Sequence, residues 1–450
     1  MKLEKNCLLR PVARSCLSGC GALLFLFFVS CATRPDVYRP VDNHVAEGDY
    51  AQAAAAIVEA QNSRKPVYPE KNAVMLFLDK GMLEHYAENY AESAVGLEEA
   101  ERLIADAYTK SVTMEIGTFI LNDNTREYSG EDYEDIYINV FNALNYYNRG
   151  NVEEALVEVR KINGKLQALA VKYSKSIDEA KQYADENGGY SGGDNEKYTF
   201  DDSALARYLA ALFWRGTGHS DDARIDLDAL VQAYRTSPEV YDNPVPSTVP
   251  DEYRVPQGEA RLNLIAFTGL SPLKEEDITY IPLPFAFPND TAKIALPVMR
   301  DRPVRAVHVE AIIDNTERVT LELIEDMGKV MEETFKARRS LIYVKAVVRT
   351  IVKTSVAAIA HAAVADQSGD DWGLLAGIAG RLFTEGTEAA DTRSARYFPR
   401  YAFVGGINLP PGEHAVTLNF YSGGSIVMTT QKTVQLRENR LNLVEGICLK

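Results

Sequence analysis

The sequence predicts an α+β protein of several domains, with an α-helical repeat domain followed by an antiparallel β-sandwich-like domain that a helical hairpin interrupts. Three observations support this. Apolar residues recur at helical spacing over 41–234, five prolines fall within 238–256, and strand-like alternation begins at Ala260. We therefore expect a signal segment at 1–30, a helical domain at 31–237, a proline-rich linker at 238–256 and a mixed β domain at 257–450.

Composition and charge narrow the class of protein. The 450 residues are 46% apolar and 25% charged, which is typical of globular proteins. The net charge of -16 argues against broad contact with nucleic acid phosphates, so we expect no nucleic acid partner. Of the five cysteines, four lie at the N-terminus and the fifth is Cys448, which indicates a targeting segment rather than a disulfide framework.

Residues 1–30 predict a lipoprotein signal peptide. Basic residues precede an uncharged run, Gly21–Val29, that is far shorter than the roughly 20 residues of a membrane-spanning helix. The segment ending at Cys31 resembles the bacterial lipobox, which implies cleavage before Cys31 and its acylation; a plain secretory signal cut elsewhere is the alternative. Because Ala32 stands where Asp would retain the protein at the inner membrane, we expect a lipid-anchored protein of the bacterial cell envelope at the outer membrane, on its periplasmic face or at the surface.

The helical half contains four similar turns. Glycine suits the left-handed cap that ends a helix, and the polar residue after it suits the start of the next. The turns resemble those of tetratricopeptide repeats but are 40, 62 and 68 residues apart, rather than about 34, so we expect degenerate repeats with insertions; an irregular helical bundle is the alternative. They are Gly48-Asp-Tyr50, Glu88-Asn-Tyr90, Gly150-Asn-Val152 and Gly218-His-Ser220.

The C-terminal half alternates as strands do. Strands are expected at 260–267, 293–298 and 304–311, then a helical stretch after Thr320 and a second helix at 371–388, which together make a helical insertion at about 325–390. Strands at 413–421, 426–436 and 441–449, joined by tight turns, predict an antiparallel meander. An α+β sheet layer is the alternative to the sandwich.

Patterns for catalysis are weak. Gly189-Tyr-Ser191-Gly-Gly193 matches the letters of a hydrolase nucleophile elbow, but its polar flanks favour a glycine-rich linker. No two of the six histidines lie within ten residues of each other, and the sequence has no phosphate-binding glycine loop. We therefore expect a protein that is not an enzyme and needs no metal or cofactor.

Candidate partner-binding residues cluster around the third turn. The acidic group at 131–135 begins a helix, where we interpret it as a solvated helix start; a cation or basic-partner site is the alternative. Two glutamates spaced i, i+4 on the following helix share a face that could meet a partner. The candidates are Glu131, Asp132, Glu134, Tyr146, Tyr147, Glu154, Glu158 and Arg160.

The segment 340–380 combines a stripe of basic residues with small residues that allow close helix packing. We interpret it as a buried hairpin packed on the sheet, with a membrane-surface or oligomer-forming hairpin as the alternative. The residues singled out are Lys345, Arg349, Lys353, Trp372, Gly373 and Gly377.

Several motifs resemble an uncharacterised family of bacterial lipoproteins with tetratricopeptide-like helices. The resemblance implies that the gene lies near genes for lipoproteins similar to the curli secretion channel and to penicillin-binding-protein activators, and so implies a role in envelope assembly without a catalytic residue. The sequence departs from the family pattern at Ala395, where the family usually has a tryptophan. The matching motifs are Tyr128–Glu134, Ala143–Asn145, Gly150, Glu154–Arg160, Ala390–Arg393, Pro399 and Leu409–Gly412.

These expectations combine into one functional prediction. The protein is expected to be a lipid-anchored, non-enzymatic scaffold or assembly factor that binds envelope proteins, including other lipoproteins, and meets the membrane through its lipid. One alternative is a membrane-active or pore-associated subunit that uses the 340–380 hairpin. The other is an envelope-polymer hydrolase that uses Ser191.

Overall fold

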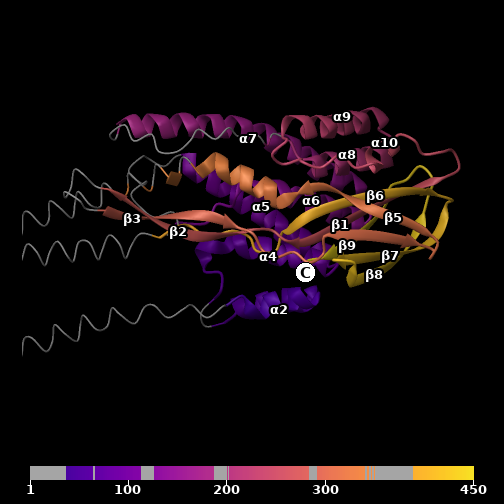
Figure 1. Ribbon diagram of the computed structural model, residues 1–450, viewed down its shortest axis with the longest axis horizontal. Coiled ribbons are helices and arrows are strands. Elements are labelled where there is room, and N and C mark those ends of the chain that lie inside the picture. The colour runs from indigo at the N-terminus through magenta and orange to yellow at the C-terminus, as the bar shows by residue number, and fades with distance from the viewer. Residues whose placement is uncertain are drawn as a thin grey trace, which may run out of the picture.

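Helices form the N-terminal half of the chain and strands most of the C-terminal half, in a computed structural model (Figure 1). The structure describes residues 37–63, 66–112, 126–186, 200, 202–282, 291–339, 342, 343, 346, 349 and 389–450. The mixed helical and sheet architecture predicted from the sequence is confirmed, with helices preceding strands.

Eight of the described helices form four consecutive pairs. A short 3-10 helix, Glu70–Asn72, precedes the second pair, and α10, Thr248–Asp251, follows the last. Helices of a pair pack closely: a Cβ at Gly81 of α4 would come within 2.8 Å of Leu97 Cδ2 on α5. The pairs are α2 (Arg39–Glu47) with α3 (Tyr50–Gln61), α4 (Ala73–Tyr86) with α5 (Tyr90–Val112), α6 (Asp132–Asn148) with α7 (Val152–Glu186), and α8 (Ala204–Gly216) with α9 (Ser220–Thr236).

The turn within each pair has the same geometry. Gly48, Gly150 and Gly218 have φ values of 85°, 84° and 84°, and Glu88 takes the same left-handed conformation at 63°. In every turn the following N–H donates to a carbonyl five residues back, as Asp49 does to His44 and Asn151 to Tyr146. The left-handed caps predicted from glycine are therefore confirmed at Gly48, Gly150 and Gly218, and Glu88 takes the same conformation without a glycine.

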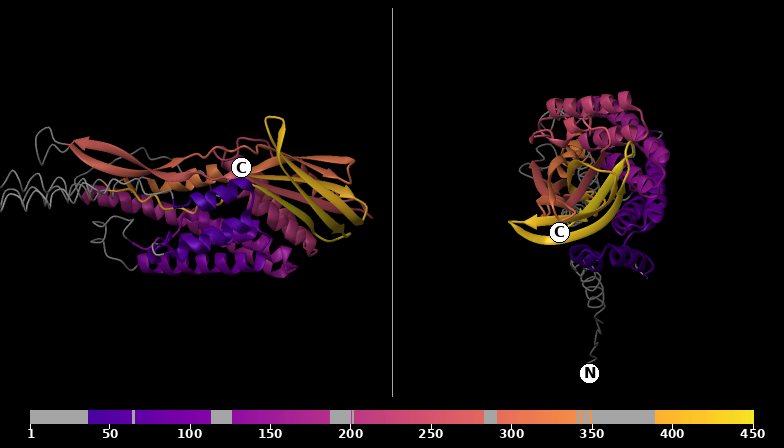
Figure 2. Two further views of the ribbon diagram at one scale, coloured as in Figure 1. Left: turned by 90° about the horizontal axis from the view of Figure 1, so that it is seen from below. Right: turned by 90° about the vertical axis from the view of Figure 1, so that its right-hand side faces the viewer.

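Helix α6 is the centre of the molecule. All its residues from Asp132 to Asn145 except Asp135 are buried, although five of them carry carboxyl or amide side chains. Phe141 on this helix lies 5.0 Å, centroid to centroid, from Phe267 of the sheet. The other helices continue along one side of the sheet and wrap part of the way around it (Figure 2).

Seven strands form one mixed sheet in the order β8-β7-β4-β5-β6-β1-β9. Two further strands, β2 (Leu273–Pro282) and β3 (Thr291–Arg300), form a separate antiparallel hairpin that projects beyond the sheet (Figure 1). The seven are β1 (Ala260–Leu270), β4 (His308–Ile313), β5 (Glu317–Asp326), β6 (Pro399–Leu409), β7 (Gly412–Ser422), β8 (Ser425–Leu436) and β9 (Asn442–Cys448).

The prediction of a sandwich of two facing sheets is corrected to one curled sheet. The curl brings β9 against β7, since a Cβ at Gly446 would come within 2.5 Å of Leu418 Cδ1. One sheet thus supplies both walls of an apolar cluster that includes Leu262, Leu264 and Phe420. The opposite face of β1, with Ile265 and Phe267, packs on the helices, so β1 is buried on both faces.

Two strand predictions are also corrected. β7 and β8 form the expected hairpin, but β9 leaves the predicted meander and pairs in parallel with β1, from Leu262↔Asn442 to Thr268↔Cys448. The helical stretch expected after Thr320 begins only at 327, because β5 continues to Asp326 with its last residues buried in the sheet.

The proline-rich segment is part of the core. Tyr241 in this segment donates its hydroxyl hydrogen bond to the buried carboxylate of Glu325 on β5, at 2.7 Å. The same carboxylate accepts from Tyr137 of α6 at 2.8 Å and from Ser203, the residue before α8, at 2.9 Å. One carboxylate therefore joins the helices, the segment at 238–256 and the sheet.

Replacing Glu325 by Ala is expected to lower the free energy of unfolding by about 3 kcal/mol, because the buried hydroxyls of Tyr137 and Ser203 lose their acceptor and that of Tyr241 keeps only the Asp202 carbonyl oxygen. Urea unfolding followed by circular dichroism measures the change. Glu317→Ala, an exposed glutamate on the same strand, is the matched control. Equal stability of the two variants would contradict the role given to Glu325.

Candidate functional site

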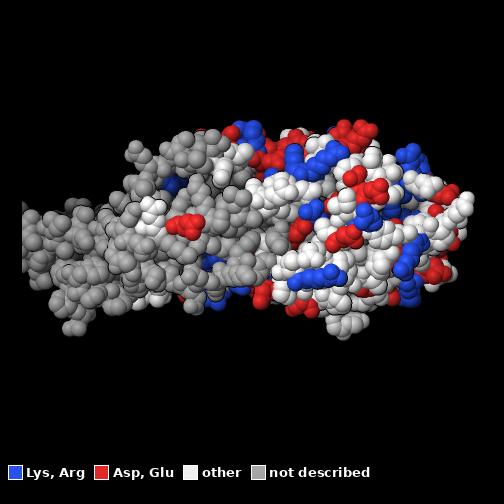
Figure 3. All heavy atoms as spheres, turned by 90° about the horizontal axis from the view of Figure 1, so that it is seen from above, with Lys and Arg blue, Asp and Glu red and all other residues white. Residues whose placement is uncertain are grey.

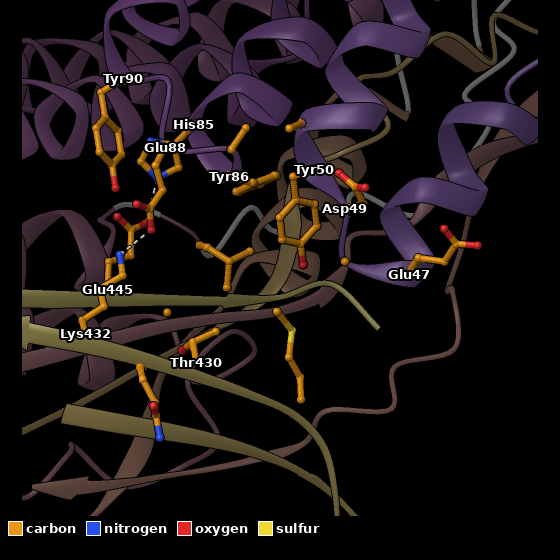
Figure 4. A pocket seen from close by; sticks show the side chains of 17 residues that line it. Glu47, Asp49, Tyr50, His85, Tyr86, Glu88, Tyr90, Thr430, Lys432 and Glu445 are labelled. Atoms are coloured by element: carbon orange, nitrogen blue, oxygen red, sulfur yellow. Dashed lines mark hydrogen bonds and ion pairs between the residues drawn. The ribbon is translucent and has the colours of Figure 1, made fainter. Parts of the chain in front are cut away.

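An open cleft of about 670 Å³ lies between two helical turns and the two edge strands of the sheet (Figure 4). The α2–α3 and α4–α5 turns form one side, and β8 and β9 form the other. Its volume lies within the range of sites that bind small ligands or short peptide segments. The lining residues are 47–51 and 85–88, Tyr90, Met428, 430–432 and 445–447.

A buried ion pair forms the floor of the cleft. His85 at the end of α4 places Nε2 2.8 Å from Oε1 of Glu445 on β9, and its Nδ1 lies 2.7 Å from Oδ1 of Asn145 on α6. The amide nitrogen of Asn145 donates to Ser93 and Asn142, which leaves Oδ1 as the acceptor for His85. Nδ1 of His85 therefore donates to Asn145, and Nε2 faces the Glu445 carboxylate, an arrangement that favours the protonated ring.

The pKa of His85 agrees with this assignment. Burial alone would lower it, but the negative charge of Glu445 and the hydrogen bonds from the ring to Glu445 and Asn145 raise the pKa above its ordinary value of 6.5. Both ring nitrogens are thus engaged by protein groups. The pair therefore joins α4, α6 and β9 beneath the cleft.

Tyrosines hold β9 in place at the ends of the cleft. The hydroxyl of Tyr50 on α3 accepts a hydrogen bond from the Leu449 N–H at 3.1 Å, and that of Tyr147 on α6 accepts one from the Leu443 N–H at 2.9 Å. Burial raises the pKa of both phenols, so they remain neutral. In Figure 4, Tyr50 and Tyr90 extend from the helical side toward the strands.

The rim of the cleft is acidic. Glu88 pairs with Lys432 of β8 at 2.8 Å, whereas Glu47 and Asp49 are exposed in the α2–α3 turn. Asp49 also accepts a hydrogen bond from the Gln52 N–H and so caps α3. Elsewhere acidic and basic side chains are intermixed, as on the face drawn in Figure 3.

The acidic cluster predicted at the start of α6 lies inside the protein. The Glu131 carboxylate binds Lys274 at 2.6 Å and Arg338 at 2.8 Å, and Asp132 is buried as well. Glu134 accepts from the Ala395 N–H at 2.6 Å, and burial next to the charge of Glu131 raises its pKa to about 7. The prediction of a solvated helix start is corrected, because distant segments of the chain cover this end of α6.

The candidates on the third helical pair are separated in the structure. Glu154 is exposed, but Glu158 is buried and binds Asn139 at 2.6 Å, so the two glutamates do not form the exposed face expected of them. The Tyr146 hydroxyl donates a hydrogen bond to the Glu98 carboxylate. The exposed Arg160 lies over the Trp214 ring, with its Cζ 4.8 Å from the ring centroid. Of the predicted group, only Tyr147 touches the strand that lines the cleft.

The hairpin candidates fall mostly outside the part of the chain that the structure describes. Arg349 is buried, and Ala346 packs against Ile294 of the β2–β3 hairpin. In the described ranges no helix is both long and apolar enough to cross a bilayer, and no group of three or more His, Cys, Asp or Glu could hold a metal ion. Outside the described residues lie Cys31, Ser191, Lys345, Lys353, Trp372, Gly373 and Gly377.

The sequence reasoning missed His85 and Glu445. They are 360 residues apart, so no local motif contains both. One local signal was available: Glu445 is a charged residue that follows the apolar residues Leu443 and Val444 in a predicted strand. A charge at a buried position requires a buried partner.

The comparisons with known proteins add one structure. No family model matches the sequence, and no curated protein matches it. The chain is similar to the Rap conjugation gene regulator of the plasmid pLS20 in complex with the Phr* peptide, at 16% identity and a TM-score of 0.22. The match covers 52% of this chain and 60% of that one. A likeness of this extent supports no inference about function.

The buried pair gives a testable pH dependence. Because the pKa of His85 is raised in the folded state, its contribution to stability is complete below pH 6.5 and is lost as the pH rises through the folded-state pKa. We therefore expect the melting temperature of the wild-type protein to fall as the pH rises above 6.5. In His85→Gln the part of this fall that comes from His85 is expected to be absent. Thermal unfolding between pH 6 and pH 9, with His308→Gln on β4 as the control, measures it; an unchanged slope in His85→Gln would contradict the assignment.

Proposed function

We propose that the protein is a lipid-anchored, non-enzymatic scaffold of the bacterial cell envelope that binds a protein partner in the cleft. The observation that carries the proposal is the cleft itself, which is open to solvent. Its floor is a satisfied ion pair and its walls carry Tyr50, Tyr86 and Tyr90. Tyrosines combine a large apolar surface with a polar tip and are enriched at protein interfaces.

The helical half supports the same proposal. Its four turns share one hydrogen-bonding pattern, and we interpret the pairs as degenerate tetratricopeptide-like repeats. Stacked helical pairs generate extended surfaces that bind segments of other proteins. The turns at Gly48 and Glu88 form one side of the cleft, so the repeat architecture and the binding site coincide there.

Photo-crosslinking in the producing bacterium tests partner binding. Gln431 and Gln435 are both exposed on β8, but only Gln431 lines the cleft. With p-benzoylphenylalanine at each position in turn, we expect a discrete protein adduct from position 431 and none from position 435, detected by electrophoresis and identified by mass spectrometry. No adduct at 431, or the same adducts at both positions, would count against the cleft as the binding site.

Metabolic labelling tests the lipid anchor. If Cys31 is acylated, labelled palmitate will enter the wild-type protein and the Cys448→Ala variant but not Cys31→Ala, as measured by fluorography of the purified chain. Cys448 is buried at the end of β9, so it is the matched cysteine control. Palmitate retained by Cys31→Ala would contradict the proposed anchor.

A further inference from the structure

The outer edge of β9 faces the cleft without a strand beside it. β9 is the terminal strand of the sheet, and among the described residues β1 is its only strand partner. Three consecutive residues of β9, 445–447, line the cleft, which shows that the backbone itself is part of the wall. An unpaired strand edge is a template for pairing with another chain.

The tyrosine contacts identify which backbone groups point into the cleft. The N–H groups of Leu443 and Leu449 point away from β1, because they donate to the hydroxyls of Tyr147 and Tyr50. Successive N–H groups of a strand alternate between its two edges. The N–H groups of Glu445 and Ile447 therefore lie on the same outer edge, between the two tyrosines.

The opposite wall is the other edge strand of the sheet. β8 contributes 430–432 to the cleft, and the Thr430 hydroxyl oxygen is covered by protein atoms yet has no hydrogen-bond partner among the described residues. The cleft is thus a gap in a curled sheet, with polar groups on both sides. The span from Leu443 to Leu449 is about 20 Å, the length of a strand of about six residues.

The charge around the gap is uneven. At the β9 floor Glu445 is neutralised by His85, and at the far rim Glu88 is neutralised by Lys432. Glu47 and Asp49 lie at the end where Tyr50 binds Leu449; Glu47 is 72% exposed, and the two carboxylates outnumber the basic side chain of Lys450, whose Cε would lie 3.9 Å from a Cβ at Gly48 between them. This end favours a basic side chain.

We propose that the cleft binds an extended, largely apolar polypeptide segment that adds as a strand to β9 and carries basic side chains at the end beside Glu47 and Asp49. Main-chain hydrogen bonds from Glu445 and Ile447 supply affinity, and the acidic turn selects the segment and its direction. The proposal rests on the proposed function and specifies the kind of partner that the cleft takes.

Three blocked hexapeptides test strand addition to the purified full-length protein in detergent. They are Lys-Lys-Val-Thr-Val-Thr, its reverse Val-Thr-Val-Thr-Lys-Lys, and Glu-Glu-Val-Thr-Val-Thr. Fluorescence anisotropy gives their affinities, and hydrogen exchange read by mass spectrometry with electron-transfer fragmentation reports individual amides. One of the two lysine peptides, the one whose direction matches the cleft, is expected to bind about tenfold more tightly than the glutamate peptide. It is expected to slow hydrogen exchange at the amides of Glu445 and Ile447 and to leave exchange at Leu443 and Leu449 unchanged.

Two sets of variants separate the backbone contribution from the charge contribution. Ile447→Pro removes an N–H that points away from β1, a position where an edge strand accepts proline, and is expected to weaken the lysine peptide about tenfold. The double variant Glu47→Gln/Asp49→Asn keeps the α3 cap, since Asn also caps helices, and is expected to abolish the preference for lysine over glutamate. Glu317→Gln/Glu413→Gln, at exposed positions on β5 and β7, is the charge-matched control.

The outcomes distinguish this proposal from the proposed function. Binding without slower exchange at Glu445 and Ile447, equal binding of the glutamate peptide, or no binding of either lysine peptide would overturn strand addition. A position-431 crosslink obtained alongside any of these results would leave protein binding in the cleft standing. If Ile447→Pro does not fold, the exchange measurement and the charge variants still decide the matter.

Discussion

Buried carboxylates hold the helical and strand halves of this protein together. Each of four glutamates collects hydrogen bonds from segments that are far apart in the chain: Glu134, Glu252, Glu325 and Glu445. Glu252, for example, is bound by Arg261 and Asn263 of β1 and by Tyr208 of α8. A buried carboxylate without such partners costs several kcal/mol. The halves therefore cannot separate without leaving these charges unpaired, and the sheet and helices share one core.

Local features of this fold could be predicted from the sequence, and long-range features could not. Each of the four helical turns needs one residue in the left-handed conformation and a carbonyl five residues back that accepts a hydrogen bond. Their geometry therefore follows from a few neighbouring residues. Strand positions follow from alternation. The order of the strands in the sheet does not follow from alternation, because alternation indicates which face of a strand is buried but not which strand lies beside it. The sequence therefore could not place β9 next to β1.

The same distinction explains the candidate site. The sequence predicts solvated positions for Glu131 and Glu134 because the groups that cover them, Arg338 and Ala395, lie more than two hundred residues away. The sequence does not indicate that His85 and Glu445 form a pair, because they too are far apart in the chain. A charged side chain within an apolar strand is the one local sign that a buried partner exists, although it does not say where the partner lies.

The position of β9 in the chain has a consequence for how the protein is assembled. β9 follows, in sequence order, all the other strands that the structure describes, yet it supplies the floor of the cleft and the partner of His85. Chains emerge from the ribosome N-terminal end first. The helical turns are thus synthesised long before the strand that completes the cleft, and His85 stays without its carboxylate until about 360 further residues have been made. A chain that lacks β9 would have neither the floor of the cleft nor the carboxylate that faces His85.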